Sequence, residues 1–198
     1  MTRIRSVTAI TALVSLVCAG TALAAQVTGG TSTITPTPAA AALLATNHIT
    51  VTPIAPATAS GGMFTFPITG GNVNKHNFHG VIRNGGGFTL SNGTQHVQVR
   101  RLVTVWDRHG VSVFAVVRRH VQRNCHHTGP HHVLHCTTVL LTTAARVARV
   151  TGVSVSGGSA TGTVKITRFT AGVINHLAGS HIVSAGATLG TAKVTPTL

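Results

Sequence analysis

The feature that most constrains this chain is a succession of short runs in which β-branched or apolar residues alternate with polar ones. Such runs are typical of strands, because successive side chains on a strand point to opposite faces. We predict strands at residues 32–37, 48–54, 64–68, 96–106, 111–117, 137–143, 145–156, 163–169 and 192–197. Turn-forming stretches such as "RNGGG" and "SGGSATG" separate them. This spacing favours an all-β fold, either an antiparallel β-sandwich or a barrel-like domain.

Two segments interrupt the strand pattern, and each has the signals of a short helix. In "TPAAAALLATN", Thr37 can cap the amino terminus, Pro38 suits the first helical position and Asn47 can end the helix. In "TAGVINHLAG", Thr170 and Gly179 can have the same roles. The surrounding sequences, "GTSTITPTPAAAALLATNHI" and "GTVKITRFTAGVINHLAGSHI", also align. The alignment indicates either a strand–helix–strand unit used twice or a chance similarity between Thr- and Ala-rich stretches.

The amino-terminal segment has the pattern of a Sec signal peptide. A basic start, MTRIR, precedes an uncharged apolar stretch and small residues at Ala22 and Ala24. The apolar stretch is shorter than the roughly 20 residues that a membrane span needs. A lipoprotein signal at Cys18 is the alternative, but the preceding Val17 is larger than the residue usual there. We therefore predict a signal peptide at residues 1–24 and one secreted or envelope-associated domain without a membrane span at residues 25–198.

The domain that follows the signal peptide is strongly basic. Without Arg3 and Arg5 it has 13 Lys and Arg residues against one acid, Asp107, and a formal charge of +12. We predict an anion-binding set that consists of Arg100, Arg101, Arg118, Arg119, Arg123, Arg146 and Arg149. Such a field attracts polyanions, and wall polymers, lipid head groups and extracellular DNA are the candidate partners of an exported protein. The alternative is adaptation to an unusual medium, in which a chain without carboxylates avoids acid-linked loss of stability.

The scarcity of acids also limits catalysis. A glycosidase needs a pair of carboxylates and a HExxH zinc site needs a glutamate, whereas the chain has one acid in total. A Ser–His–Asp triad could use only Asp107, whose context "VWDRHG" is typical of a hairpin turn. We therefore predict that the protein is not an enzyme.

The stretch "NCHHTGPHHVLHC" places five histidines between two cysteines. Cys125 and Cys136 are the only cysteines outside the signal peptide, and in an oxidising compartment we expect them to form a disulfide at the base of a hairpin. The predicted metal ligands are the loop histidines His126, His127, His131, His132 and His135. Neutral imidazoles suit Cu, Ni and Zn, so we expect weak binding of one of these ions in preference to haem. Acid should abolish that binding, because protonated imidazole does not bind metal.

Part of the chain resembles a known family. The stretch "FTFPITGGNV" precedes "GVIRNGGGFTLSNGTQHVQVRRLVTV", and a glycine turn then leads into "VSVFAVV". Over residues 64–117 this arrangement is similar to HtaA-type domains of secreted and surface haem-acquisition proteins of actinobacteria. The resemblance implies an extracellular β-rich domain and haem contact. Members that bind haem use a tyrosine as axial ligand and this chain has none, so a haem role would fall to histidines, among them His76 and His79.

Three functions follow from these observations. The leading hypothesis is a non-enzymatic binding module whose basic face associates with anionic polymers of the cell envelope. The resemblance to HtaA-type domains implies, as an alternative, a carrier of haem or of a transition metal. The third hypothesis is a structural surface protein without a discrete ligand.

Overall fold

The computed structural model describes residues 24–128 and 133–198, apart from the side chains of residues 121–137. The strands in this part of the chain are β1 (Ala24–Val27), β2 (Gly29–Pro36), β3 (Thr50–Ile54), β4 (Thr58–Ser60), β5 (Met63–Asn74), β6 (Gly80–Asn84), β7 (Gly87–Ser91), β8 (His96–Asp107), β9 (Gly110–Thr128), β10 (Val133–Ser156), β11 (Ser159–Ile166) and β12 (Thr188–Thr197). The helices are α1 (Pro38–Thr46) and α2 (Arg168–Ala178). The all-β class with two short helices is therefore confirmed.

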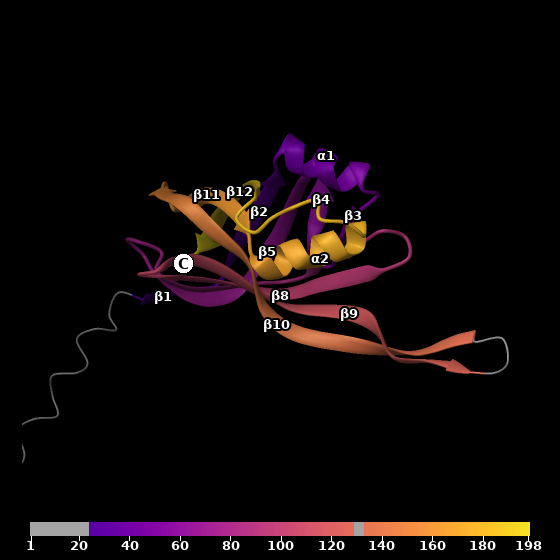
Figure 1. The fold of residues 1–198 in the computed structure, drawn as a ribbon. Helices are drawn as coiled ribbons and strands as arrows, with labels where there is room; N and C mark the ends of the chain where they lie inside the picture. Colours follow the sequence, from indigo (N-terminus) through magenta and orange to yellow (C-terminus); the bar gives the residue numbers. More distant parts are fainter. Residues whose placement is uncertain (1–23, 129–132) are drawn as a thin grey trace, which may run out of the picture.

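Eight of the strands form a closed barrel (Figure 1). Antiparallel pairing follows the order β5, β2, β12, β11, β10, β9 and β8. Strand β6 closes the ring because it pairs with both β8 and β5. Strands β1, β4 and β7 pair with members of the ring but lie outside it, and β3 pairs with β7. Of the two architectures that the sequence allowed, the structure has the barrel.

Closure of the barrel at β5 and β6 depends on two glycines. Gly71 of β5 has a φ of +147°, and Gly80 of β6 has a φ of +146°. A Cβ atom at Gly71 would overlap the carbonyl oxygen of Val81, and one at Gly80 would overlap the carbonyl oxygen of Asn72. Because the two backbones lie this close and the φ angles suit residues without a Cβ atom, only glycine fits at both positions.

Strands β9 and β10 form the longest hairpin of the molecule. They contain 19 and 24 residues, and their pairing runs from Val111 opposite Val150 to Thr128 opposite Val133. Figure 1 shows the far part of this hairpin extending well beyond the barrel. The sequence predicted two strands, at 137–143 and 145–156, where the structure has β10 alone. A register shift between Arg146 and Ala148, and not a turn, separates the two halves of β10.

Helix α1 begins and ends as the sequence predicts. The hydroxyl oxygen of Thr37 accepts a hydrogen bond from the backbone N–H of Ala40 at 3.1 Å, and Pro38 is the first helical residue. The side-chain amide of Asn47 donates to the carbonyl oxygen of Leu43 at 2.8 Å. None of the residues of α1 is buried. The helix therefore covers the strands without contributing a fully enclosed side chain to the core.

Helix α2 begins earlier than the sequence predicts. Its N-cap is Thr167 and not Thr170, because the Thr167 hydroxyl oxygen accepts the backbone N–H of Thr170 at 3.3 Å. The same hydroxyl donates to the carbonyl oxygen of Arg146 at 2.7 Å, which ties the start of α2 to β10. The helix ends at the predicted Gly179, which has a φ of +69°.

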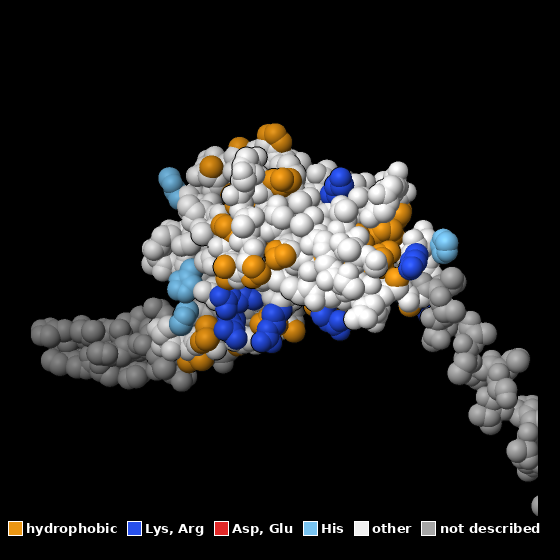
Figure 2. All heavy atoms as spheres, turned by 180° about the vertical axis from the view of Figure 1, so that it is seen from behind, with side chains coloured by type: hydrophobic (Ala, Val, Ile, Leu, Met, Phe, Trp, Pro, Cys, Tyr) orange, Lys and Arg blue, Asp and Glu red, His pale blue; other side chains and the backbone are white. Residues whose placement is uncertain are grey.

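Helix α2 covers one face of the sheet formed by β8, β9 and β10. It buries four residues, Ala171, Val173, Ile174 and Leu177, in the main hydrophobic core. The facing strand residues in that core are Val97 and Val99 of β8, Ala115 and Val117 of β9, and Val147 of β10. Neither of the two described helices covers the opposite face of these three strands (Figures 1 and 2). In the described part of the chain no helix has the length and apolar content to cross a membrane.

Candidate functional site

The face of β8, β9 and β10 opposite α2 gathers histidine, arginine and apolar side chains, and we call it the outer face. Pairing of Gln98 with Arg118, and of Arg118 with Thr142, fixes which residues belong to it. Its members include His96, Gln98, Arg100 and Val103 of β8; Ser112, Phe114, Val116, Arg118 and His120 of β9; and Leu140, Thr142, Ala144, Arg146 and Arg149 of β10. Figure 2 shows this side of the molecule, with basic side chains grouped beside histidines and apolar atoms.

Two imidazoles lie side by side on the outer face. The ring centroids of His96 and His120 are 5.3 Å apart and the rings are inclined at 62°. Both residues are exposed, so their ring nitrogens can meet a ligand from solvent. The sequence places these histidines within the basic segment but does not indicate that they meet. Counting residues from the hairpin turn at Asp107–Gly110 would not have revealed the pair, because a register shift between Arg100 and Val103 changes the pairing of β8 with β9.

Four of the predicted anion-binding arginines share the outer face: Arg100, Arg118, Arg146 and Arg149. Arg149 also pairs across the sheet with Lys165 of β11, a cation that the prediction did not include. The Nε atoms of Arg100 and Arg118 are buried and have no hydrogen-bond partner among the described residues. A buried N–H group without an acceptor is costly, so these arginines favour the approach of an anion.

The other predicted arginines do not join this group. Arg101 is exposed at a β-bulge of β8, between the pairs that Arg100 and Val103 make with β9. Arg119 pairs with the buried Val97 and therefore lies on the face beneath α2. Arg123 lies on β9 opposite Thr137, and its side chain is outside the described part. The single acid, Asp107, accepts the backbone N–H of His109 at 2.7 Å in the turn that the sequence predicts.

Apolar side chains border the histidine pair. Leu140 lies directly opposite His120 in the pairing of β9 with β10 and is 51% exposed. Phe114, further along β9, is 40% exposed. Exposed leucine and phenylalanine beside cations give the outer face both an apolar and an anion-binding component.

The histidine loop lies at the far end of the β9–β10 hairpin. His126 pairs with His135, and Leu134 pairs with His127, whereas His131 and His132 fall outside the described residues. The pairs Arg123–Thr137 and His126–His135 leave Cys136 opposite residues 124–125, so the backbone brings the two cysteine positions together. The hairpin is confirmed, and the disulfide and the loop metal site stay predictions.

The remaining histidines are dispersed. His79 lies 5.7 Å from Trp106 between ring centroids, at the β5–β6 turn, and His76 is exposed in the same turn. Among the described residues no three His, Cys, Asp or Glu side chains come together as a metal-binding group. The His96–His120 pair therefore offers two imidazole ligands without a third His, Cys, Asp or Glu beside them among the described residues.

Comparison with solved structures connects this architecture to one group of proteins. The chain superposes on the N-terminal domain of HtaA from Corynebacterium glutamicum with a TM-score of 0.56 and 13% identity, over 85% of this chain and 98% of that one. For the C-terminal domain of HtaA from the same organism the TM-score is 0.55 at 15% identity, over 87% and 99% of the two chains. The heme binding protein HtaB of that organism gives 0.54 at 14% identity, over 88% and 95%.

These matches show that the chain has the fold of HtaA and HtaB domains. The resemblance that the sequence indicates over residues 64–117 is confirmed, and the structure extends it to most of the chain. No protein-family model matches the chain, and no curated protein matches it by sequence.

Proposed function

We propose that this protein binds haem on its outer face, through His96 and His120, and does not act as an enzyme. The observation that carries the proposal is the exposed pair of imidazoles beside arginines on the fold of HtaA and HtaB domains. HtaB of Corynebacterium glutamicum is a heme binding protein with this fold, which supports the same ligand for this chain. We further propose that the protein is secreted or attached to the cell envelope.

The outer face has residues that can contact the iron, the propionates and the apolar ring of a haem. Imidazole nitrogen is a common ligand of haem iron. Arg118 is two residues from His120 on β9 and Arg100 is four residues from His96 on β8, or about 7 Å and 13 Å along a strand. Arginines at these distances can form charge-assisted hydrogen bonds with the propionates of a haem whose iron lies at the histidines.

The apolar part of the haem would meet Leu140 and Val116. Leu140 lies opposite His120 and is exposed, and Val116 lies between Arg118 and Phe114 on the same face. When bound, the haem supplies the iron and the two carboxylates, while the chain supplies the ligand pair, the cations and the apolar contacts. Because the sequence contains no tyrosine, His96 and His120 would be the residues that bind the haem iron in this proposal.

Haemin titration of variants tests the proposal. We expect the unmodified protein to give a saturable change in the Soret band, and a His96→Ala, His120→Ala double variant to lose it. A His176→Ala, His181→Ala variant is the matched control, because it also removes two exposed histidines but leaves the outer face intact. A double variant at His96 and His120 that still gives the full Soret change would place the haem elsewhere and overturn the proposed site.

The arginines provide a second readout. Arg118→Gln should weaken haemin binding about tenfold, since it removes a charge-assisted hydrogen bond to a propionate. Arg168→Gln, at an exposed arginine outside the outer face, is the control and should leave the affinity unchanged. Equal affinities for both variants would exclude the proposed role of Arg118.

A second candidate function is binding of anionic polymers. It is favoured by the grouping of Arg100, Arg118, Arg146 and Arg149 on the outer face, with Lys165 next to Arg149. Wall polymers, lipid head groups and extracellular DNA share the repeated negative charges that such a group of cations attracts.

A further inference from the structure

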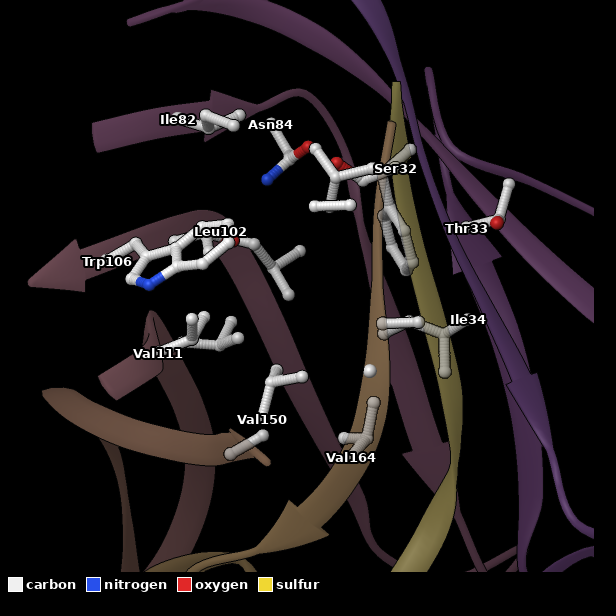
Figure 3. Close-up of a pocket in the computed structure, with 18 of the residues that line it drawn as sticks. Ser32, Thr33, Ile34, Ile82, Asn84, Leu102, Trp106, Val111, Val150 and Val164 are labelled. Atoms are coloured by element: carbon white, nitrogen blue, oxygen red, sulfur yellow. The ribbon is translucent and has the colours of Figure 1, made fainter. Parts of the chain in front are cut away.

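The interior of the barrel contains a cavity of about 120 Å³. Figure 3 shows side chains from strands on all sides pointing into it. The wall is largely apolar, with Phe66, Ile82, Leu102, Val111 and Val164 among its members. The single tryptophan of the chain, Trp106, also lines the cavity. A space of this size is too small for the four pyrrole rings of a haem, so it is distinct from the site proposed on the outer face.

Two buried polar side chains interrupt the apolar wall. Ser32 of β2 is 8% exposed and Asn84 of β6 is 7% exposed. Both point into the cavity (Figure 3). The Ser32 hydroxyl oxygen and the Asn84 carbonyl oxygen Oδ1 have no hydrogen-bond partner among the described residues. Buried polar atoms are nearly always paired, so an unpaired hydroxyl and an unpaired amide oxygen in one cavity indicate a ligand that pairs with them.

Water alone does not account for this arrangement. A buried water makes about three hydrogen bonds, and a cavity lined by apolar side chains stays dry but accepts apolar guests such as benzene at about 150 Å³. One water beside Ser32 and Asn84 would leave most of the 120 Å³ against apolar side chains. A molecule with one polar group and an apolar body satisfies both parts of the wall.

We propose that the barrel interior binds a small single-ring molecule that carries one hydroxyl group, phenol being the simplest. The ring would contact the apolar wall, including Leu102 and Trp106. The ligand hydroxyl would donate a hydrogen bond to Asn84 Oδ1 and accept one from the Ser32 hydroxyl. A single ligand atom would then pair with both the Ser32 hydroxyl and Asn84 Oδ1, the two unpaired polar groups described above in the cavity wall.

Phenol and toluene test this site as a matched pair, because they differ by a hydroxyl in place of a methyl group of similar size. Each is titrated into the full chain, and binding is followed by the fluorescence of Trp106, excited at the red edge of its absorption where neither ligand absorbs. We expect saturable binding of phenol and about tenfold weaker binding of toluene, the effect of losing hydrogen bonds to buried groups. Equal affinities, or no saturable change with phenol, would overturn the proposal.

Variants locate the ligand within the barrel. Ser32→Ala should reduce phenol affinity towards that of toluene and leave toluene affinity unchanged, whereas Ser156→Ala, at an exposed serine, should change neither. Ala192→Leu, which adds volume to the cavity wall, should abolish binding of both ligands. Circular dichroism establishes that each variant is folded. Phenol binding that persists in folded Ala192→Leu protein would place the ligand outside the cavity and refute the proposal.

Discussion

Arg101 shows how one residue decides the geometry of the proposed haem site. It has a φ of +54°, which is uncommon for residues other than glycine, and with Leu102 it forms a bulge opposite Ala115. Counted from the turn at residues 107–110, an unshifted register would place His120 opposite Val97. The extra residue in β8 moves the register by one, and His120 meets His96 instead.

This contact could not be predicted from the sequence, for a physical reason. The alternation of residues 96–106 and the turn "WDRHG" predict the hairpin, but a bulge depends on how β8 must bend to join β6 and β7 on its other side. The burial of Ser32 and Asn84 could not be predicted either, because serine and asparagine are typical of turns and surfaces. Only the closed barrel makes them interior residues.

The glycines of the β5–β6 pair provide a prediction at the residue scale. Gly71→Ala should lower the free energy of unfolding by about 3 kcal/mol, because the new Cβ atom would overlap the Val81 carbonyl oxygen at a strained φ angle. Urea unfolding followed by Trp106 fluorescence measures the change. Gly29→Ala is the control: its Cβ would meet no atom within 4 Å, so its effect should stay within about 0.5 kcal/mol. Equal losses for both would contradict the close-approach argument.

At the scale of elements, the two helices have the same cap but a different relation to the core. Thr37 and Thr167 each accept a backbone N–H three residues later. Four residues of helix α2 are buried in the core, whereas no residue of α1 is buried. The presence of both helices and their carboxyl-terminal ends were predictable from local signals, because threonine, proline, asparagine and glycine act on their immediate neighbours, whereas the start of α2 is at Thr167 and not at the predicted Thr170. Their unequal burial depends on the strands beneath them and was not predictable.

Substitution of the two N-cap threonines should therefore lower the free energy of unfolding of the protein by unequal amounts. Thr167→Ala should lower the free energy of unfolding by about 2 kcal/mol, since it removes the N-cap and the bond to the Arg146 carbonyl. Thr37→Ala should cost less than about 1 kcal/mol, because α1 can fray without opening the core. Thermal unfolding of both variants measures the difference, and a larger loss for Thr37→Ala would show that α1 has been assigned too small a role.

At the scale of the whole molecule, the positive charge is concentrated but not uniform. The outer face has four arginines, and further exposed cations, such as Arg83, Arg168 and Lys193, lie elsewhere. The sequence predicted a basic segment from residue 100 to residue 149 and the alternation of its strands. It did not predict which arginines share a face, because bulges in β8 and β10 change the alternation.

The salt dependence of DNA binding shows whether binding depends on the arginines grouped on the outer face or only on the net charge of the protein. With double-stranded DNA as the probe, affinity should fall steeply as salt rises, with the logarithmic slope decreasing by about 0.9 for each phosphate contact removed. We expect glutamine at Arg100, Arg118, Arg146 and Arg149 to reduce the slope. Glutamine at Arg83, Arg108, Arg168 and Lys193 gives the same net charge and should reduce it much less. Equal slopes in the two variants would leave net charge as the only cause.

The position of β12 has a consequence for when the molecule can fold. Strand β12 lies between β2 and β11, with Gly190 opposite Pro36 and Ala160 opposite Val194. While residues 188–197 are still being synthesised, β2 and β11 each lack a neighbour and the ring stays open. The ring can therefore close only after residues 188–197 have been synthesised, so the eleven preceding strands cannot complete the barrel on their own.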